Sequence, residues 1–99
     1  MILESAPLDV KAGEEAAFEA AFAEAKAIIA AMPGFVSLEL QRCLERRGRY
    51  LLLVRWRTLE DHTVGFRGGP LFPEWRAIVG PFFAQPPRVE HFELVGKTA

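Results

Sequence analysis

Several features that are typical of other protein classes are scarce or missing in this chain of 99 residues. A single cysteine, Cys43, excludes an internal disulfide framework and a zinc site built from several cysteines. The 12 lysines and arginines are balanced by 13 aspartates and glutamates, for a net charge of -1. Proteins that bind the phosphate backbone of nucleic acids need a basic excess, so we expect no nucleic-acid partner.

Long apolar runs are also missing. No segment approaches the roughly 18 apolar residues that a membrane-spanning helix requires, and the N-terminus has no basic region followed by a cleavage site of small residues. We therefore expect a cytoplasmic protein without a membrane partner. The two histidines, His62 and His91, stand apart and form no HExxH pattern, so we expect no metal site.

Apolar and aromatic residues, by contrast, are plentiful. Hydrophobic residues make up 51% of the chain, and they include eight phenylalanines, two tryptophans and one tyrosine. This share is too high for a disordered chain, and the length suits one small domain that spans residues 1–99. The aromatic rings provide large units for a core or for an apolar pocket.

Hydrophobic spacing predicts two helical regions. The first runs over 14–32, because its apolar residues recur at helical spacing along one stripe formed by Phe18, Phe22, Ala25, Ile29 and Met32. The second begins after a cap at Thr58, runs as a short helix through Phe66 and resumes at Pro70. The apolar stripe of its later part is formed by Leu71, Phe72, Trp75, Ile78 and Val79.

Four strands complete the pattern, over 2–10, 35–46, 50–57 and 88–95. Pro7 lacks a backbone N–H, so we expect it at an edge or at an irregular position of the sheet. The strand over 50–57 is apolar on both faces, which indicates that both faces are covered. The helices of so short a chain cover only one side, so we expect a second copy of the chain on the other side.

The resulting order, βαββαβ, predicts a ferredoxin-like α+β fold with an antiparallel four-stranded sheet. The chain also resembles the antibiotic biosynthesis monooxygenase (ABM) family of the dimeric α+β barrel superfamily. The segments that carry the resemblance include Pro33-Gly34-Phe35, Tyr50 to Trp56, Asp61 to Arg67, Pro70 to Trp75 and Val89-Glu90-His91-Phe92. The resemblance implies a subunit that dimerises through its sheet and holds a cavity between sheet and helices. Some members oxidise polycyclic phenols to quinones without a cofactor, and others degrade haem or have no known reaction.

The catalytic sets of this family are only partly present. The haem-degrading branch has a catalytic Asn, Trp and His. In an alignment without gaps, the resemblance places Ala6, Gly65 and Trp75 of this chain at those three positions. The quinone-forming branch relies on an Asn, a Trp, a Tyr and an Arg, whereas this chain has no Asn and a single Tyr, Tyr50. The candidate residues must therefore come from the chemistry of this chain itself.

His62 is the leading candidate for acid–base chemistry. It lies four residues before Phe66, so the two side chains share a helix face and can look into one cleft. The alternative is a histidine that bonds to backbone near the helix start. Arg67 would hold a phenolate or carboxylate at the rim of the cleft, while an ion pair with a nearby acid is an equal alternative. His91, on the last strand, is expected at the surface.

Four aromatic residues are expected to bind a flat substrate, and the alternative is that they only pack in the core: Phe66, Phe72, Trp75 and Phe83. Together these observations predict a homodimeric ABM-type monooxygenase that acts on an aromatic or other electron-rich small molecule and needs neither metal nor flavin. His62 would take the proton of the substrate, and Arg67 would stabilise the negative charge.

Two alternatives to this function stay open. One is a haem-binding or haem-degrading protein with His62 as the iron ligand. The other is a dimer that binds a small ligand, or serves in assembly, without catalysis.

Overall fold

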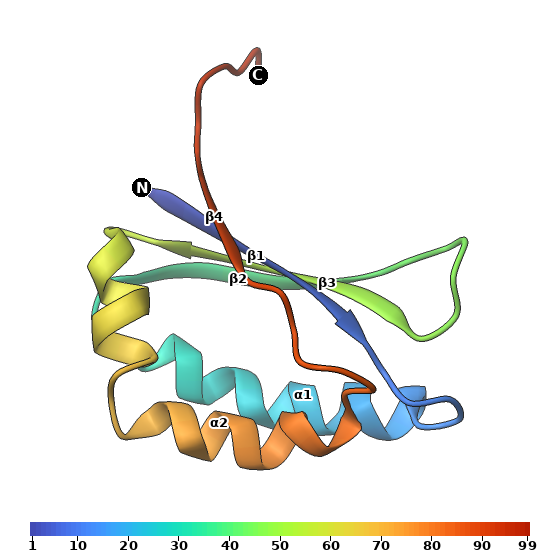
Figure 1. Ribbon diagram of the computed structural model, residues 1–99. Helices are drawn as coiled ribbons and strands as arrows, with labels where there is room; N and C mark the ends of the chain where they lie inside the picture. Colours follow the sequence, from blue (N-terminus) through green and yellow to red (C-terminus); the bar gives the residue numbers. More distant parts are fainter.

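The computed structural model describes residues 1–99, arranged as one layer of sheet over one layer of helices (Figure 1). The elements are, in chain order, β1 (Ile2–Asp9), α1 (Glu15–Ala30), β2 (Phe35–Arg42), β3 (Arg49–Trp56), η1 (Asp61–Phe66), α2 (Leu71–Val79), η2 (Gly80–Phe82) and β4 (Glu90–Glu93). This βαββαβ arrangement confirms the predicted ferredoxin-like fold. No helix is long and apolar enough to cross a membrane.

The four strands form one antiparallel sheet in the order β2-β3-β1-β4. β1 lies between β3 and β4, so Pro7 belongs to an inner strand and not to an edge strand. β4, however, pairs only with the first part of β1, from Ile2 to Ser5. Pro7 lies beyond this paired stretch, next to a locally open side of β1, where its missing N–H costs no ladder hydrogen bond.

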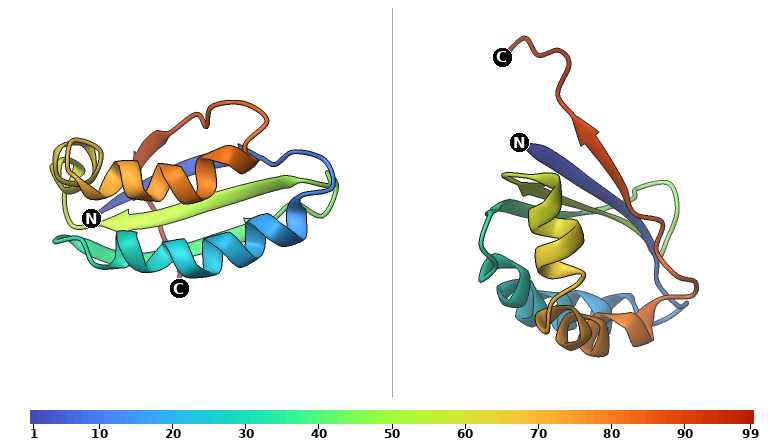
Figure 2. Two further views of the ribbon diagram at one scale, coloured as in Figure 1. Left: turned by 90° about the horizontal axis from the view of Figure 1, so that it is seen from below. Right: turned by 60° about the vertical axis from the view of Figure 1, so that its left-hand side comes forward.

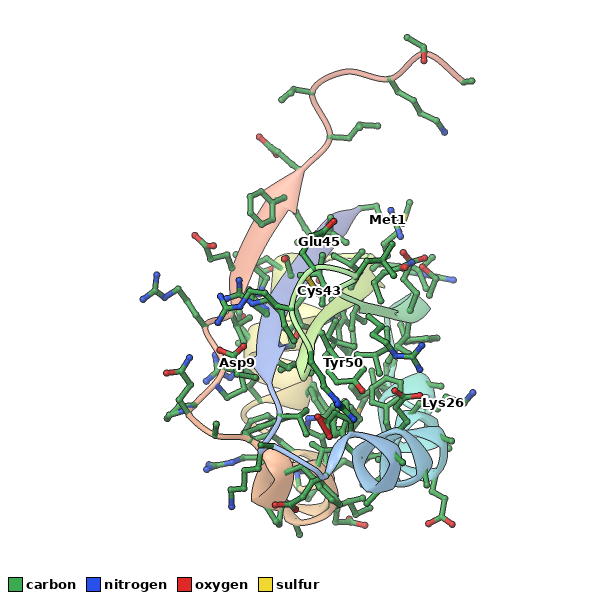
Figure 3. All side chains as sticks on the ribbon, turned by 90° about the vertical axis from the view of Figure 1, so that its right-hand side faces the viewer. Met1, Asp9, Lys26, Cys43, Glu45 and Tyr50 are labelled. Carbon is green, nitrogen blue, oxygen red and sulfur yellow. The ribbon has the colours of Figure 1, made fainter.

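The inner face of the sheet packs on the helices, and side chains fill the space between the two layers (Figure 3). Alternate residues of β3, from Tyr50 to Trp56, are buried against the helices, as the period of two in a strand requires. Tyr50 also joins the layers, because its hydroxyl donates a hydrogen bond of 2.6 Å to Glu19 on α1. The buried residues of α1 belong to the predicted stripe: Phe18, Phe22, Ala25 and Ile29.

Two strands are shorter than predicted. The strand expected over 35–46 ends at Arg42, because the residues that follow form the turn into β3. The strand expected over 88–95 is limited to the four residues of β4. Its last residue, Glu93, already pairs with Ile2, so almost no partner strand is left for the residues that follow.

The helical regions also differ in detail from the prediction. α1 ends at Ala30 instead of Met32, three residues ahead of Pro33. The short helix expected through Phe66 is the π-helix η1. Its hydrogen bonds join residues five apart, as in the bond of 2.8 Å that the Arg67 N–H donates to the His62 carbonyl. This wider turn changes which side chains of the segment lie above one another.

A reciprocal cap stabilises the start of this segment, as the sequence predicted. The Asp61 N–H donates to Thr58 Oγ1 over 3.1 Å, and the Thr58 N–H donates to Asp61 Oδ2 over 3.2 Å. The Asp61 carboxylate lies directly against Gly34, whose φ of 84° favours glycine. A Cβ atom at position 34 would collide with this carboxylate.

We expect Gly34→Ala to lower the free energy of unfolding by about 3 kcal/mol, through backbone strain and displacement of the Asp61 cap. Gly13→Ala is the matched control, because Gly13 has a φ of 82° but nothing within 4 Å of the added Cβ. The free energy of unfolding of the control should fall by only about 1 kcal/mol, because its alanine adds backbone strain but no collision. Urea unfolding followed by tryptophan fluorescence measures both, and equal losses would show that the contact with Asp61 contributes nothing.

Candidate active site

A cavity of about 490 Å³ lies between the sheet and the helical layer. Its walls come from β1, β3, η1 and α2 and from the segment over 83–89, which runs back from the helices to the sheet (Figure 2). Eighteen residues line it and ten of them are hydrophobic, so it suits a largely apolar ligand. The structure brings all six predicted site residues to this cavity: His62, Phe66, Arg67, Phe72, Trp75 and Phe83.

Phe66, Phe72 and Trp75 form an aromatic wall on one side of the cavity. Phe66 stacks on Trp56 with ring centres 6.0 Å apart, and it meets Phe72 edge-on at 5.4 Å. Trp75 packs edge-on against Phe22 of α1, with ring centres 5.8 Å apart. These contacts hold the rings in place without a ligand, so the wall presents a preformed surface to a flat aromatic molecule.

The polar end of the cavity is buried. Glu4 and His62 are only 5% and 2% exposed, and both line the cavity. Glu4 Oε1 accepts a hydrogen bond of 2.9 Å from Trp56 Nε1 and lies 3.3 Å from His62 Nε2. The other ring nitrogen of His62, Nδ1, is 2.7 Å from Nε2 of His91. Side chains of β1, β3, η1 and β4 thus meet in one chain of polar contacts.

Burial controls the charges of the Glu4–His62 pair. Burial raises the pKa of the Glu4 carboxyl, while the hydrogen bond from Trp56 and the charge of Arg67 lower it. Burial, together with the smaller effects of the neighbouring His91 and Arg67, lowers the pKa of His62 to about 4. His62 is therefore neutral at neutral pH, with one ring nitrogen able to accept a proton. The raised pKa makes the Glu4 carboxylate a stronger base than an ordinary carboxylate, and the neutral imidazole beside it can share a proton with it.

Glu4 was not predicted as a site residue, and His91 lies elsewhere than predicted. His91 is half-buried and bonded to His62, so the prediction of a surface position is wrong. The reason is a long-range one, because β4 pairs with β1 and sets His91 opposite Glu4. Glu4 did have a local signal, since it is the only charged residue among the three buried, inward-facing residues of β1, which are Glu4, Ala6 and Leu8.

The residues present do not fit ligation of a haem iron by His62. Nδ1 is bonded to His91, Nε2 faces the Glu4 carboxyl oxygen at 3.3 Å, and the ring is almost fully enclosed. Neither nitrogen has room for an iron ion. In addition, no three histidine, cysteine, aspartate or glutamate side chains are grouped so that they could hold a metal ion. The geometry therefore gives no support to haem bound through His62.

Comparisons with known proteins agree with the fold. The model of the antibiotic biosynthesis monooxygenase family matches residues 1–78. The uncharacterised protein YczJ of Bacillus subtilis (strain 168) is 47% identical over 95 residues, which are 96% of this chain and 100% of YczJ. A Bordetella bronchiseptica crystal structure, provisionally assigned as an antibiotic biosynthesis monooxygenase, has a TM-score of 0.91 and 41% identity over 95% of this chain and 96% of its own. SnoaB of Streptomyces nogalater, described as a cofactor-independent oxygenase, has a TM-score of 0.83 and 21% identity over 97% of this chain and 94% of its own.

Burial of His62 predicts how stability changes with pH. Its pKa falls from 6.5, the ordinary value that applies to the unfolded chain, to about 4 in the folded protein. Between these values the unfolded chain binds a proton that the folded protein does not bind. The free energy of unfolding should therefore fall as the pH falls through this window, by about 3 kcal/mol in total from His62.

Urea unfolding at several pH values in this window, with His62→Gln as the control, measures the effect. The raised pKa of Glu4 acts in the opposite direction, because the folded protein takes up that proton at a higher pH than the unfolded chain does. The difference between wild type and variant isolates the contribution of His62, since Glu4 is present in both. Parallel pH curves would contradict a buried, neutral His62.

Proposed function

Because the chain belongs to the antibiotic biosynthesis monooxygenase family, we propose that it is a monooxygenase whose substrate is a flat, electron-rich aromatic molecule bound in this cavity. The observation that carries the proposal is the aromatic wall beside the buried Glu4–His62 pair. A phenol that stacks on this wall would bring its hydroxyl group to a proton acceptor in a site sheltered from water.

The proposed reaction needs neither metal nor flavin. Loss of a proton turns the phenol into a phenolate, which transfers an electron to O₂, and the two radicals combine at a ring carbon. The hydroperoxide that results loses water and leaves a quinone, so one oxygen atom of O₂ ends in the quinone and the other in water. SnoaB, which has this fold and is described as cofactor-independent, supports this kind of chemistry for such a cavity.

Each polar side chain has a proposed part in this reaction. His62 accepts the proton together with Glu4, whose Oε1, 3.3 Å from Nε2, would pair with the imidazolium that forms. Arg67 stabilises the phenolate from the rim of the cavity, because its positive charge also acts on Glu4 and His62 at the buried end. The substrate is held flat, and water is excluded, by the rings of Phe66, Phe72, Trp75 and Phe83.

An oxygen-electrode screen of phenols, naphthols and anthrols tests the proposed function. The protein is assayed with a chelator and without added metal or flavin, and we expect consumption of O₂ together with the absorbance of a quinone. Stabilisation of the protein by a phenol without consumption of O₂ would favour the alternative of a non-catalytic binding protein. Quinone formation only after addition of a metal or flavin would contradict the cofactor-independent mechanism.

The Glu4–His62 pair can be tested with a substrate from this screen. Glu4→Gln and His62→Gln are each expected to lower kcat by about 100-fold or more, because a general base contributes about 10²–10⁴-fold. Glu90→Gln, which removes an exposed carboxylate of β4, is the matched control and should keep the wild-type kcat. An unchanged kcat in His62→Gln would show that the imidazole is not the base.

We also propose that the chain forms a homodimer through the outer face of its sheet, as proteins of this family typically do. This face carries no covering layer in the single chain (Figure 1). Phe92, which lies there opposite Leu3, is 48% exposed. The strands place further apolar residues on the same face, namely Leu51 and Leu53. A second copy on this face would remove these side chains from water.

Light scattering at micromolar concentration is expected to give twice the chain mass of 11.1 kDa. Leu53→Lys should raise the dissociation constant of the dimer at least about tenfold, because it places a charge in the interface. In the monomer Glu39 lies opposite position 53 and can pair with the lysine, so the fold should persist. Ala20→Lys, on the exposed side of α1, is the control. A monomeric wild-type mass would contradict the proposed dimer.

A further inference from the structure

Two arginines lie at the rim of the cavity, and both contact the same aromatic ring. Arg67 follows η1 and Arg76 belongs to α2, and both are exposed while they also line the cavity. Their guanidinium carbons lie 5.7 Å and 5.9 Å from the centre of the Phe72 ring. Arg76 is four residues beyond Phe72, so the two share one face of α2. Contact with an aromatic ring restrains each guanidinium group near the rim.

These two guanidinium groups have no acidic partner within the chain. Three of the other seven arginines do have one, since Arg42 pairs with Glu19, Arg47 with Glu15 and Arg49 with Asp9. Arg67 and Arg76, by contrast, form neither an ion pair nor a side-chain hydrogen bond. The alternative role predicted for Arg67, an ion pair with a nearby acid, is not found in the structure.

The charges that line the cavity are therefore unequal. Glu4 is the only acidic residue of its wall, it lies at the buried end, and it is already in contact with Trp56 and His62. The rim holds two positive charges that form no ion pair, although the charge of Arg67 acts on Glu4. A ligand that carries an anionic group would supply the missing charge, and the planar fork of arginine matches a carboxylate in particular.

We propose that Arg67 and Arg76 together bind the carboxylate of the substrate, so that the substrate class is a flat hydroxy-aromatic acid. The ring lies on the aromatic wall, its hydroxyl group reaches the Glu4–His62 pair and its carboxylate lies between the two arginines. This assignment rests on the proposed function for the place of the ring and the hydroxyl group. The volume of about 490 Å³ suits a ligand of two or three fused rings.

Binding of two matched compounds tests the proposal. 6-Hydroxy-2-naphthoate has a hydroxyl group and a carboxylate at opposite ends of a flat bicycle, and 2-naphthol lacks the carboxylate. Titration calorimetry should show that the acid binds at least about tenfold more tightly, a difference of about 1.4 kcal/mol. The preference should weaken at high salt, because the arginines are exposed.

The double variant Arg67→Gln, Arg76→Gln should lose this preference, so that it binds the acid no more tightly than it binds 2-naphthol. Arg88→Gln removes an exposed arginine that is not part of the cavity wall, so it should keep the preference. Far-ultraviolet circular dichroism verifies that each variant is folded. Equal affinities for the two compounds, a preference that survives the double substitution, or failure of both compounds to bind would each overturn the proposal.

Binding and turnover separate this proposal from the proposed function. If the acid binds through the two arginines but neither it nor any other phenol consumes O₂, the ligand class stands and the monooxygenase activity fails. If phenols without an acid group are oxidised as efficiently as hydroxy-aromatic acids, the activity stands and the assignment of the arginines fails.

Discussion

The contact of Glu4 with His62 and Trp56 is the interaction on which the rest of the site depends. An ionisable carboxyl that is 5% exposed is costly to bury unless it has polar partners, and Glu4 obtains them from two other elements, β3 and η1. His91 adds β4 to the same chain of contacts. A shift of β1 by one residue would turn Glu4 to the outer face and leave His62 without its carboxyl partner. The geometry of the site therefore depends directly on the register of the sheet.

The same constraint explains the unusual helical segment between β3 and α2. The Thr58–Asp61 cap holds the start of η1, and the absence of a side chain at Gly34 lets the Asp61 carboxylate approach. The π-helical segment then directs His62, the residue after Asp61, to Glu4, while Phe66 at its end stacks on Trp56. Since π-helical turns are rare and concentrate at functional sites, their cost fits a segment that positions both the polar and the aromatic part of the cavity.

Much of the fold and part of the site were predictable from the sequence, because they follow from local periodicity. The apolar alternation in β3 and the stripe of α1 determine which faces are buried, and the order of elements then leaves few topologies. All six predicted site residues reach the cavity wall because they lie in or directly after consecutive helical segments that pack against the sheet. His91 was not predictable in this way, since its position depends on the pairing of β4 with β1, which are distant in the sequence. Glu4 was overlooked because a charged residue in an apolar alternation is usually read as an exposed position.

Arg67 connects the two ends of the cavity electrostatically. Its charge lowers the pKa of Glu4 and also that of His62, so it favours an ionised carboxylate beside a neutral imidazole. An anion bound at Arg67 would offset this positive charge and thereby raise both pKa values, which makes the Glu4–His62 pair a stronger base. Binding of a carboxylate at the rim and uptake of a proton at the buried end would then favour each other, as thermodynamic linkage requires. A substrate with both groups would therefore activate the base that deprotonates it, and a phenol without the acid group would not.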